Sequence, residues 1–189
     1  EDHDATCIPV HTLKSNGLAD ALDRVNAADL VVTQPIQADH FGPMKTQEII
    51  QHRSVAVVPN LFFEGHLPDC CYVGGMGQRL RSPAGEYHSI IALKSFIEGR
   101  SVEETASLFN KTTFADFGYL DLVDKSWSEL EGRAKVYDRD WSVLIAELQT
   151  LGCFSYTVNH PNLSALTVVA REALRQLGLH VNLSPQVAQ

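Results

Sequence analysis

The chain has 189 residues, of which 44% are hydrophobic, and this is enough for one domain with a sizeable core. Its net charge of −8, from 15 basic and 23 acidic residues, argues against a general nucleic-acid binder, which needs a basic surface to neutralise phosphates. No apolar run approaches the roughly 20 residues that cross a bilayer. The first residues are acidic, unlike a secretory signal, and the four cysteines include no C-x-x-C pair. We therefore expect a cytoplasmic protein with reduced thiols, no membrane insertion and no nucleic-acid partner.

The first third of the chain alternates between strand and helix patterns. Strands are predicted at 6–10, 29–33 and 55–58 from short β-branched runs, and helices at 16–25 and 46–52 from apolar spacing. A loop is expected at 37–44, and Ser15 or Asn16 can cap the first helix. This β-α-β-α-β order is typical of a parallel sheet with right-handed crossovers.

The middle of the chain is predicted to be helical. A Gly-rich loop at 74–85 precedes helices at 87–97, from Ser101 with a Ser-x-x-Glu capping box, at 114–134 with interruptions, and at 138–151. A strand at 153–158 and a helix at 161–177 follow. We predict a single α/β domain over 1–189 with a mostly parallel sheet, in a three-layer, Rossmann-like or SGNH-like arrangement. An all-α insertion at 86–151 and a C-terminal strand-helix unit complete it.

Polar residues follow three of the predicted strands. Gln34 comes after the second strand, residues 60–69 after the third, and Asn159 with His160 after the fourth. Since the carboxyl ends of parallel strands meet at one edge of a sheet, a site is expected where these segments converge.

His160 is the first candidate for a general base or acid, because the ordinary pKa of histidine lies near working pH. Asn159 beside it can donate a hydrogen bond to a developing oxyanion. The alternative is structural: Asn159 caps a helix that begins with Pro161, and His160 is a surface residue.

His66 lies between Glu64 and Asp69, which suggests a catalytic histidine oriented by a carboxylate. The alternative is a turn that Gly65 and Pro68 impose. A metal site built from His66, Asp69 and the adjacent cysteines 70 and 71 is a weaker alternative, because neighbouring cysteines do not easily reach one tetrahedral ion.

Arg79 and Arg81 lie in the Gly-rich loop before Tyr87 and His88, at the expected start of a helix. Arginines beside a helix N-terminus suit a phosphate group. The alternative is a solvated loop. No G-x-G-x-x-G follows a strand and no Walker sequence is present, so an ordinary dinucleotide or nucleotide fold is not predicted.

Four short segments together resemble the polysaccharide biosynthesis family typified by WcbI: residues 31–36, 58–69, 87–88 and 156–161, the strongest being Phe-Glu-Gly-His-x-Pro-Asp and Asn-His-Pro. The resemblance runs from about residue 29 to 179. It implies an α/β protein that binds coenzyme A, or a related 3′-phosphoadenosine compound, and transfers an acyl (acetyl) group to a sugar of a surface or capsular polysaccharide. On this view the catalytic residues are His160, His66, Glu64 and Asp69. The cofactor-binding candidates are Gln34, Lys45, Asn60, Arg79, Arg81, Tyr87, His88 and Asn159.

Members of this family usually open with a strand, an Asn-Cys-Gln motif and a helix, and Cys7 does not match that motif. We therefore expect that the family's first strand-helix element is missing. Two other functions stay open: an esterase-like hydrolase of acylated sugars, and a non-catalytic module that binds coenzyme A or a nucleotide. No metal is predicted, and a homo-oligomer is a further option.

Overall fold

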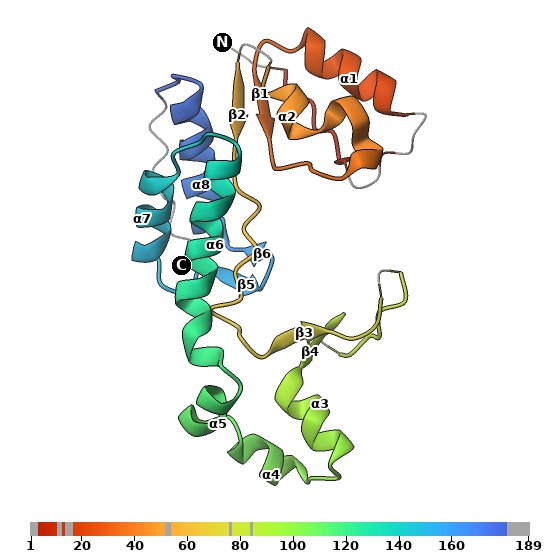
Figure 1. The fold of residues 1–189 in the computed structure, drawn as a ribbon, viewed down its shortest axis with the longest axis vertical. Coiled ribbons are helices and arrows are strands. Elements are labelled where there is room, and N and C mark those ends of the chain that lie inside the picture. Colours follow the sequence, from red (N-terminus) through yellow and green to blue (C-terminus); the bar gives the residue numbers. More distant parts are fainter. Residues whose placement is uncertain are drawn as a thin grey trace.

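The computed structural model describes residues 4–10, 13, 17–51, 54–75, 77–83 and 85–180. The chain has the outline of a letter C (Figure 1). An N-terminal unit forms its upper end, a layer of helices forms its back, and an arm made of a hairpin and short helices forms its lower end. The N-terminal unit comprises α1 (Leu18–Ala27), β1 (Val31–Thr33), the 3-10 helix η3 (Asp39–Met44), α2 (Thr46–Ile49) and β2 (Val55–Val57).

The predicted parallel pair is present in the N-terminal unit. β1 and β2 run parallel, with Val31 opposite Val55, and their β-branched side chains suit a pleated, buried surface. Ala21 and Val25 of α1 pack against Val31 in a small core. Two local predictions are wrong: residues 37–44 include a 3-10 helix, kinked at Gly42, and residues 6–10 contain no strand. The caps predicted for the first helix lie outside the described residues.

The protein is a mixed α/β structure, but the predicted large parallel sheet is not formed. The described residues contain three two-stranded sheets, of which only β1–β2 is parallel. β5 (Ser155–Thr157) pairs antiparallel with β6 (His160–Pro161) and does not extend the first sheet. The physical reason lies at the other edge of β2. There the side chain of Gln176 forms hydrogen bonds with both the backbone N–H and the backbone carbonyl of Val57.

A second hairpin replaces the start of a predicted helix. Residues 87–89 form β4 (Tyr87–Ser89), which pairs antiparallel with β3 (Cys70–Tyr72). The helix α3 (Ile90–Ile97) begins only after Ser89, whose hydroxyl accepts a hydrogen bond from the backbone N–H of Ala92. Cross-strand pairing therefore decides the structure of residues that helical spacing had assigned to a helix.

The remaining helices follow the predicted order. The capping box at Ser101 is present, with Glu104 returning the hydrogen bond. Gly99, two residues after the end of α3, has a positive φ of 70°, as a glycine that terminates a helix often does. The elements of this region are α4 (Val102–Ser107), α5 (Lys111–Asp116), the 3-10 helix η4 (Tyr119–Asp121), α6 (Leu122–Val136) and α7 (Ser142–Thr150).

The main core lies between β2, the segment that follows it, and the helices α6, α7 and α8 (Leu163–Gln176). Trp141, Leu148, Phe63 and Phe154 are buried there. The indole N–H of Trp141 donates to the carbonyl of Val57 at 3.1 Å, so the largest core side chain is also satisfied in its polar group. No helix within the described residues is long and apolar enough to cross a membrane.

The start of the last helix differs from its prediction. Asn162, not Asn159, is the N-cap of α8, and its side chain accepts from the backbone N–H of Ala165 at 2.9 Å. Pro161 is part of β6 and not the first helical residue. Asn159 is thereby free of the capping role that was the structural alternative for it.

Candidate functional site

Two tyrosines face each other across the β3–β4 hairpin. Tyr72 and Tyr87 are direct partners in the antiparallel register, their ring centroids are 5.1 Å apart, and their hydroxyl oxygens are 3.1 Å apart. Cross-strand partners at such a position project from the same face of the hairpin. The pairing therefore places two phenol groups side by side.

The turn between β5 and β6 presents a second set of polar groups. Thr157 and His160 are paired across this turn, and the Thr157 hydroxyl lies 2.6 Å from Nδ1 of His160. The same hydroxyl lies 3.2 Å from Oδ1 of Asn159. Val158 is buried beneath the turn, and its carbonyl accepts from the backbone N–H of Phe63 at 2.7 Å. The turn is thus anchored to the segment that follows β2.

Tyr87 joins the two hairpins. Its hydroxyl lies 2.8 Å from Oδ1 of Asn159 and 2.8 Å from Nδ1 of His160. We call the five residues Tyr72, Tyr87, Thr157, Asn159 and His160 the hairpin cluster. Within the described part of the chain, Nε2 of His160 and Nδ2 of Asn159 have no hydrogen-bond partner, and both side chains are exposed. One ring nitrogen and one amide group are therefore available to a ligand.

Arg79 extends the cluster on the tyrosine side. Its guanidinium carbon lies 3.8 Å from the centroid of the Tyr72 ring, a cation–π contact, and one of its nitrogens pairs with Glu86 at 3.1 Å. Burial, followed by the hydrogen bond with Tyr87, raises the pKa of Tyr72, so its phenol stays protonated at neutral pH. A cation, two phenols, an amide and an imidazole can together bind a polar anionic ligand and move a proton.

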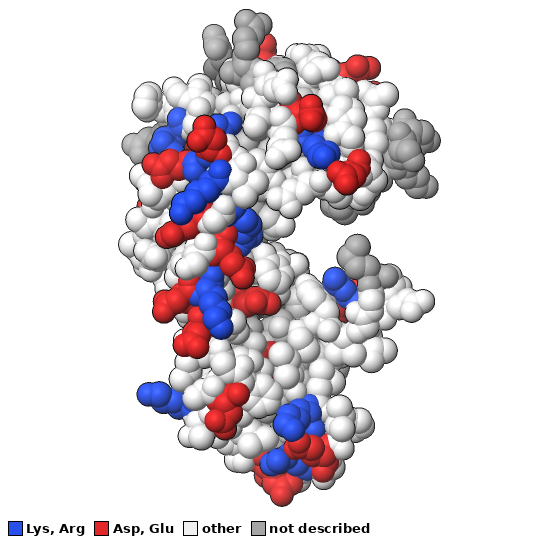
Figure 2. All heavy atoms as spheres, in the orientation of Figure 1, with Lys and Arg blue, Asp and Glu red and all other residues white. Residues whose placement is uncertain are grey.

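A hollow lies next to this cluster. Figure 2 shows a deep notch in the outline between the N-terminal unit and the lower arm that carries β3 and β4. In the same orientation, Figure 1 places the β5–β6 hairpin and the base of β3–β4 beside this notch. The strands beside it are hairpins and not members of one parallel sheet, so the predicted convergence of parallel strand ends is not what brings these segments together.

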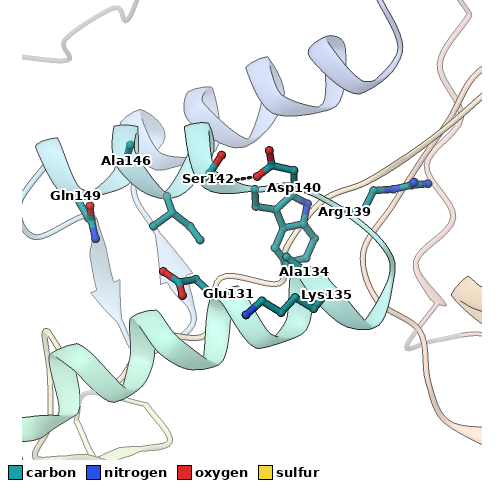
Figure 3. A pocket seen from close by; sticks show the side chains of 10 residues that line it. Glu131, Ala134, Lys135, Arg139, Asp140, Ser142, Ala146 and Gln149 are labelled. Carbon is teal, nitrogen blue, oxygen red and sulfur yellow. Dashed lines mark hydrogen bonds between the residues drawn. The ribbon is translucent and has the colours of Figure 1, made fainter.

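A different pocket, of about 370 Å³, opens between α6 and α7 (Figure 3). Charged and polar side chains from both helices line it, among them Glu131, Lys135 and Gln149, and the buried Trp141 is a further lining residue. None of the predicted site residues lines this pocket. It is therefore not the candidate site.

His66 packs into the apolar core and does not join the hairpin cluster. Its ring lies 4.6 Å from that of Phe63 and 4.7 Å from that of Phe154, and its buried Nδ1 has no partner. Burial lowers the pKa of His66. Gly65 next to it lies against α6, where a Cβ would come within 2.6 Å of the Cα of Val123. This part of the Phe-Glu-Gly-His segment thus packs onto a helix.

The two carboxylates of that segment are also outside the cluster. Asp69 accepts hydrogen bonds from the backbone N–H of Ile91 at 2.9 Å and from the Tyr119 hydroxyl at 3.0 Å, which ties β3 to α3 and η4. Glu64 is exposed in the turn. The catalytic roles of Glu64, His66 and Asp69 stay predictions, without a contact to the hairpin cluster.

The cysteines next to Asp69 are not activated as nucleophiles. Burial raises the pKa of the Cys70 and Cys71 thiols, and the neighbouring Asp69 charge acts in the same direction. All four cysteines are unpaired. No group of three or more His, Cys, Asp or Glu side chains in the described ranges is arranged to hold a metal ion.

The other predicted cofactor residues are dispersed. Lys45 pairs with Asp39 at 3.0 Å in the N-terminal unit, where Gln34 is exposed after β1. The carbonyl of Asn60 accepts from Arg133 at 2.9 Å. His88 donates through Nε2 to the carbonyl of Leu80 at 3.1 Å, and Arg81 is exposed in the loop. Of the twelve predicted site residues, the structure brings together Arg79, Tyr87, Asn159 and His160.

Sequence reasoning missed Tyr72 and Thr157. Both lie in short strands that pair antiparallel, a pairing that local periodicity does not reveal. The turn between β5 and β6 consists of Val158 and Asn159, which is not one of the dipeptides typical of a hairpin, so the sequence carried no clear signal for Thr157 opposite His160.

Comparison with known protein families identifies the family to which the chain belongs. The model of the family described as polysaccharide biosynthesis enzyme WcbI matches residues 2–182, which is nearly the whole chain. No curated protein and no solved structure matches it significantly. The match confirms the resemblance carried by the four short segments, and the chain belongs to the WcbI family of polysaccharide biosynthesis enzymes.

Proposed function

We propose that this polysaccharide biosynthesis enzyme transfers an acyl group from a coenzyme A thioester to a sugar hydroxyl, with the hairpin cluster as its active site. The observation that carries the proposal is that Tyr87, Asn159 and His160, with Arg79 linked to them through Tyr72, come together from segments as much as 81 positions apart in sequence.

The residues present fit a coenzyme A thioester in their chemistry. Arg79 offers a guanidinium to a phosphate, and Arg81 adds a second cation in the same exposed loop. The free Nδ2 of Asn159 is an amide donor next to the free Nε2 of His160. When bound, the thioester supplies an activated acyl group.

The chain's own residues then have defined tasks. His160 takes the proton of the sugar hydroxyl at Nε2, so that the oxygen can form the new ester bond with the acyl carbon. The amide of Asn159 donates a hydrogen bond to the acyl oxygen as negative charge develops on it. His160 then returns its proton to the departing sulfur, which leaves as the thiol, and the catalyst is restored.

Water is the competing acceptor, because the His160 side chain is exposed. An esterase-like hydrolase that acts on acylated sugars is therefore the second candidate. It would use the same histidine and amide and would need no coenzyme A.

The test is calorimetry with coenzyme A, followed by acetyl-CoA turnover with a panel of sugar acceptors. We expect binding, acceptor-dependent release of the thiol, and a loss of about 10²–10⁴-fold in turnover for His160→Ala, the usual contribution of a general base. The control is His180→Ala, an exposed histidine outside the cluster. Absence of coenzyme A binding would remove the acyl-transfer proposal, and ester hydrolysis without coenzyme A would favour the hydrolase.

A further inference from the structure

The hydrogen atoms of the hairpin cluster can be counted. Nδ1 of His160 contacts two hydroxyl oxygens, those of Thr157 at 2.6 Å and Tyr87 at 2.8 Å. The same two hydroxyls contact Oδ1 of Asn159, at 3.2 Å and 2.8 Å. Four short contacts thus join one ring nitrogen, two hydroxyls and one amide oxygen. A hydrogen bond needs a proton in each contact, and the amide oxygen can only accept.

The count favours one tautomer of the histidine. Each hydroxyl carries one proton, and Tyr72 directs its own either to the Tyr87 oxygen at 3.1 Å or to Oδ1 of Asn159 at 3.4 Å, so it supplies none of the four contacts. If Nδ1 of His160 carries no proton, only the two hydroxyl protons of Thr157 and Tyr87 are available for the four contacts. Two of the contacts then bring lone pairs of electrons against each other, which is repulsive. If Nδ1 carries the proton, its N–H is shared by both hydroxyl oxygens, and both hydroxyls donate to Asn159. Each of these four contacts then contains a proton.

We propose that Thr157 and Tyr87 are positioning residues that hold His160 in the Nδ1–H tautomer, with its lone pair on the exposed Nε2. Which ring nitrogen of a histidine carries the proton is set by the hydrogen bond that the other nitrogen, or the same one, makes to its neighbours. Here the neighbours are two hydroxyls whose own protons are taken up by the Asn159 oxygen.

The arrangement has a consequence for proton transfer. When His160 gains a second proton at Nε2, Nδ1 remains a donor, so no hydroxyl has to turn. A network that already has the orientation needed for the cation costs no reorganisation during the reaction. This catalytic meaning rests on the function proposed above, whereas the tautomer itself does not.

The tautomer can be measured directly. In protein labelled with ¹⁵N-histidine, long-range proton–nitrogen correlation spectra at a pH where His160 is neutral distinguish protonated from unprotonated ring nitrogens, and the His160→Gln spectrum assigns the signals. We expect a protonated Nδ1 and an unprotonated Nε2. Thr157→Val, which removes the acceptor oxygen at nearly constant size, should shift the population towards the Nε2–H form, and Thr157→Ser should retain the wild-type form.

Two outcomes overturn the proposal: an Nε2–H tautomer in the wild type, which would mean that the hydroxyls donate to the ring, or a Thr157→Val spectrum equal to the wild type. If Thr157→Val does not fold, Tyr87→Phe removes the second acceptor and serves the same purpose. The spectra need neither coenzyme A nor turnover, so the two proposals can fail separately. An inactive protein with the Nδ1–H tautomer would contradict only the proposed function, and an active protein with the Nε2–H tautomer would contradict only this inference. If both hold, Thr157→Val should lower kcat more than it raises KM for acetyl-CoA, with rescue by Thr157→Ser.

Discussion

The side chain of Gln176 pairs with the backbone of Val57 as a neighbouring strand would. Its Oε1 accepts from the Val57 N–H at 2.9 Å, and its Nε2 donates to the Val57 carbonyl at 2.9 Å. Glu172, which is buried, holds the amide in place by accepting from the same Nε2 at 2.7 Å. The second edge of β2 is therefore satisfied by α8, so no further strand can be added to the sheet next to β2.

Replacement of Gln176 by Leu should destabilise the protein by about 1–3 kcal/mol, the cost of leaving a buried backbone N–H without a partner. The carbonyl of Val57 keeps the hydrogen bond from the Trp141 indole, so the loss falls mainly on the N–H. Urea unfolding followed by circular dichroism measures the change. Gln149→Leu, at an exposed position of α7, is the control and should stay within about 0.5 kcal/mol. Equal effects of the two changes would contradict the pairing.

This relationship also shows where sequence reasoning about the fold stops. β1, β2, the capping box at Ser101 and most helices could be predicted, because each depends on residues close in sequence. The partner of Val57 is a side chain that lies 119 positions away, so this pairing could not be predicted from the periodicity of the sequence. The β3–β4 pairing overrode the helical pattern of residues 87–89 in the same way.

Arg133 of α6 should stabilise the segment after β2. Its guanidinium donates to the carbonyl of Asn60 at 2.9 Å and to that of Phe62 at 3.1 Å, and burial lowers the pKa of Arg133. Replacement by Met should cost about 1.5–3 kcal/mol, typical of hydrogen bonds to charged groups, in a thermal or urea unfolding measurement. Replacement by Lys should recover only part of this, since one ammonium cannot reproduce the planar fork. Lys135→Met, at an exposed position of the same helix, should have little effect. If Arg133→Met leaves the free energy of unfolding unchanged, the segment after β2 does not depend on the two hydrogen bonds from Arg133.

His66 should make stability dependent on pH. Its pKa is lowered in the folded protein by burial, whereas the unfolded chain has the ordinary value of about 6.5. Between these two values the unfolded state binds more protons, so the free energy of unfolding should fall as the pH drops below about 6.5. His66→Leu keeps an apolar contact with Phe63 and Phe154 and should remove this part of the slope. Above about pH 7.5 the two proteins should show parallel curves. A wild-type and a variant profile that run parallel down to pH 5 would contradict the prediction.

Part of the candidate site could be predicted from the sequence. Asn159, His160, Tyr87 and Arg79 could be named from residue type and position, although the expected helix start at Tyr87 and the expected parallel strand ends were wrong. Tyr72 and Thr157 could not, because their roles come from facing Tyr87 and His160 across hairpins. A cluster made of cross-strand partners depends on register, which short strands encode weakly.

Arg79 should bind the ligand's phosphate more tightly when Glu86 no longer neutralises it. The pair is 3.1 Å apart, and the Arg79 side chain keeps 28% of its surface exposed, so an anion can reach it. Arg79→Gln should weaken coenzyme A binding about tenfold, or ~1.4 kcal/mol, and should reduce the dependence of affinity on salt. Glu86→Gln should have the opposite sign and strengthen binding, because the guanidinium loses its competing carboxylate. Arg100→Gln, which breaks a similar pair with Glu98 at the end of α3, is the matched control and should leave affinity unchanged. Calorimetry at two salt concentrations measures all three variants.

If Glu86→Gln weakens binding as much as Arg79→Gln does, the pair acts as a unit that shapes the loop, and Arg79 is not the phosphate ligand.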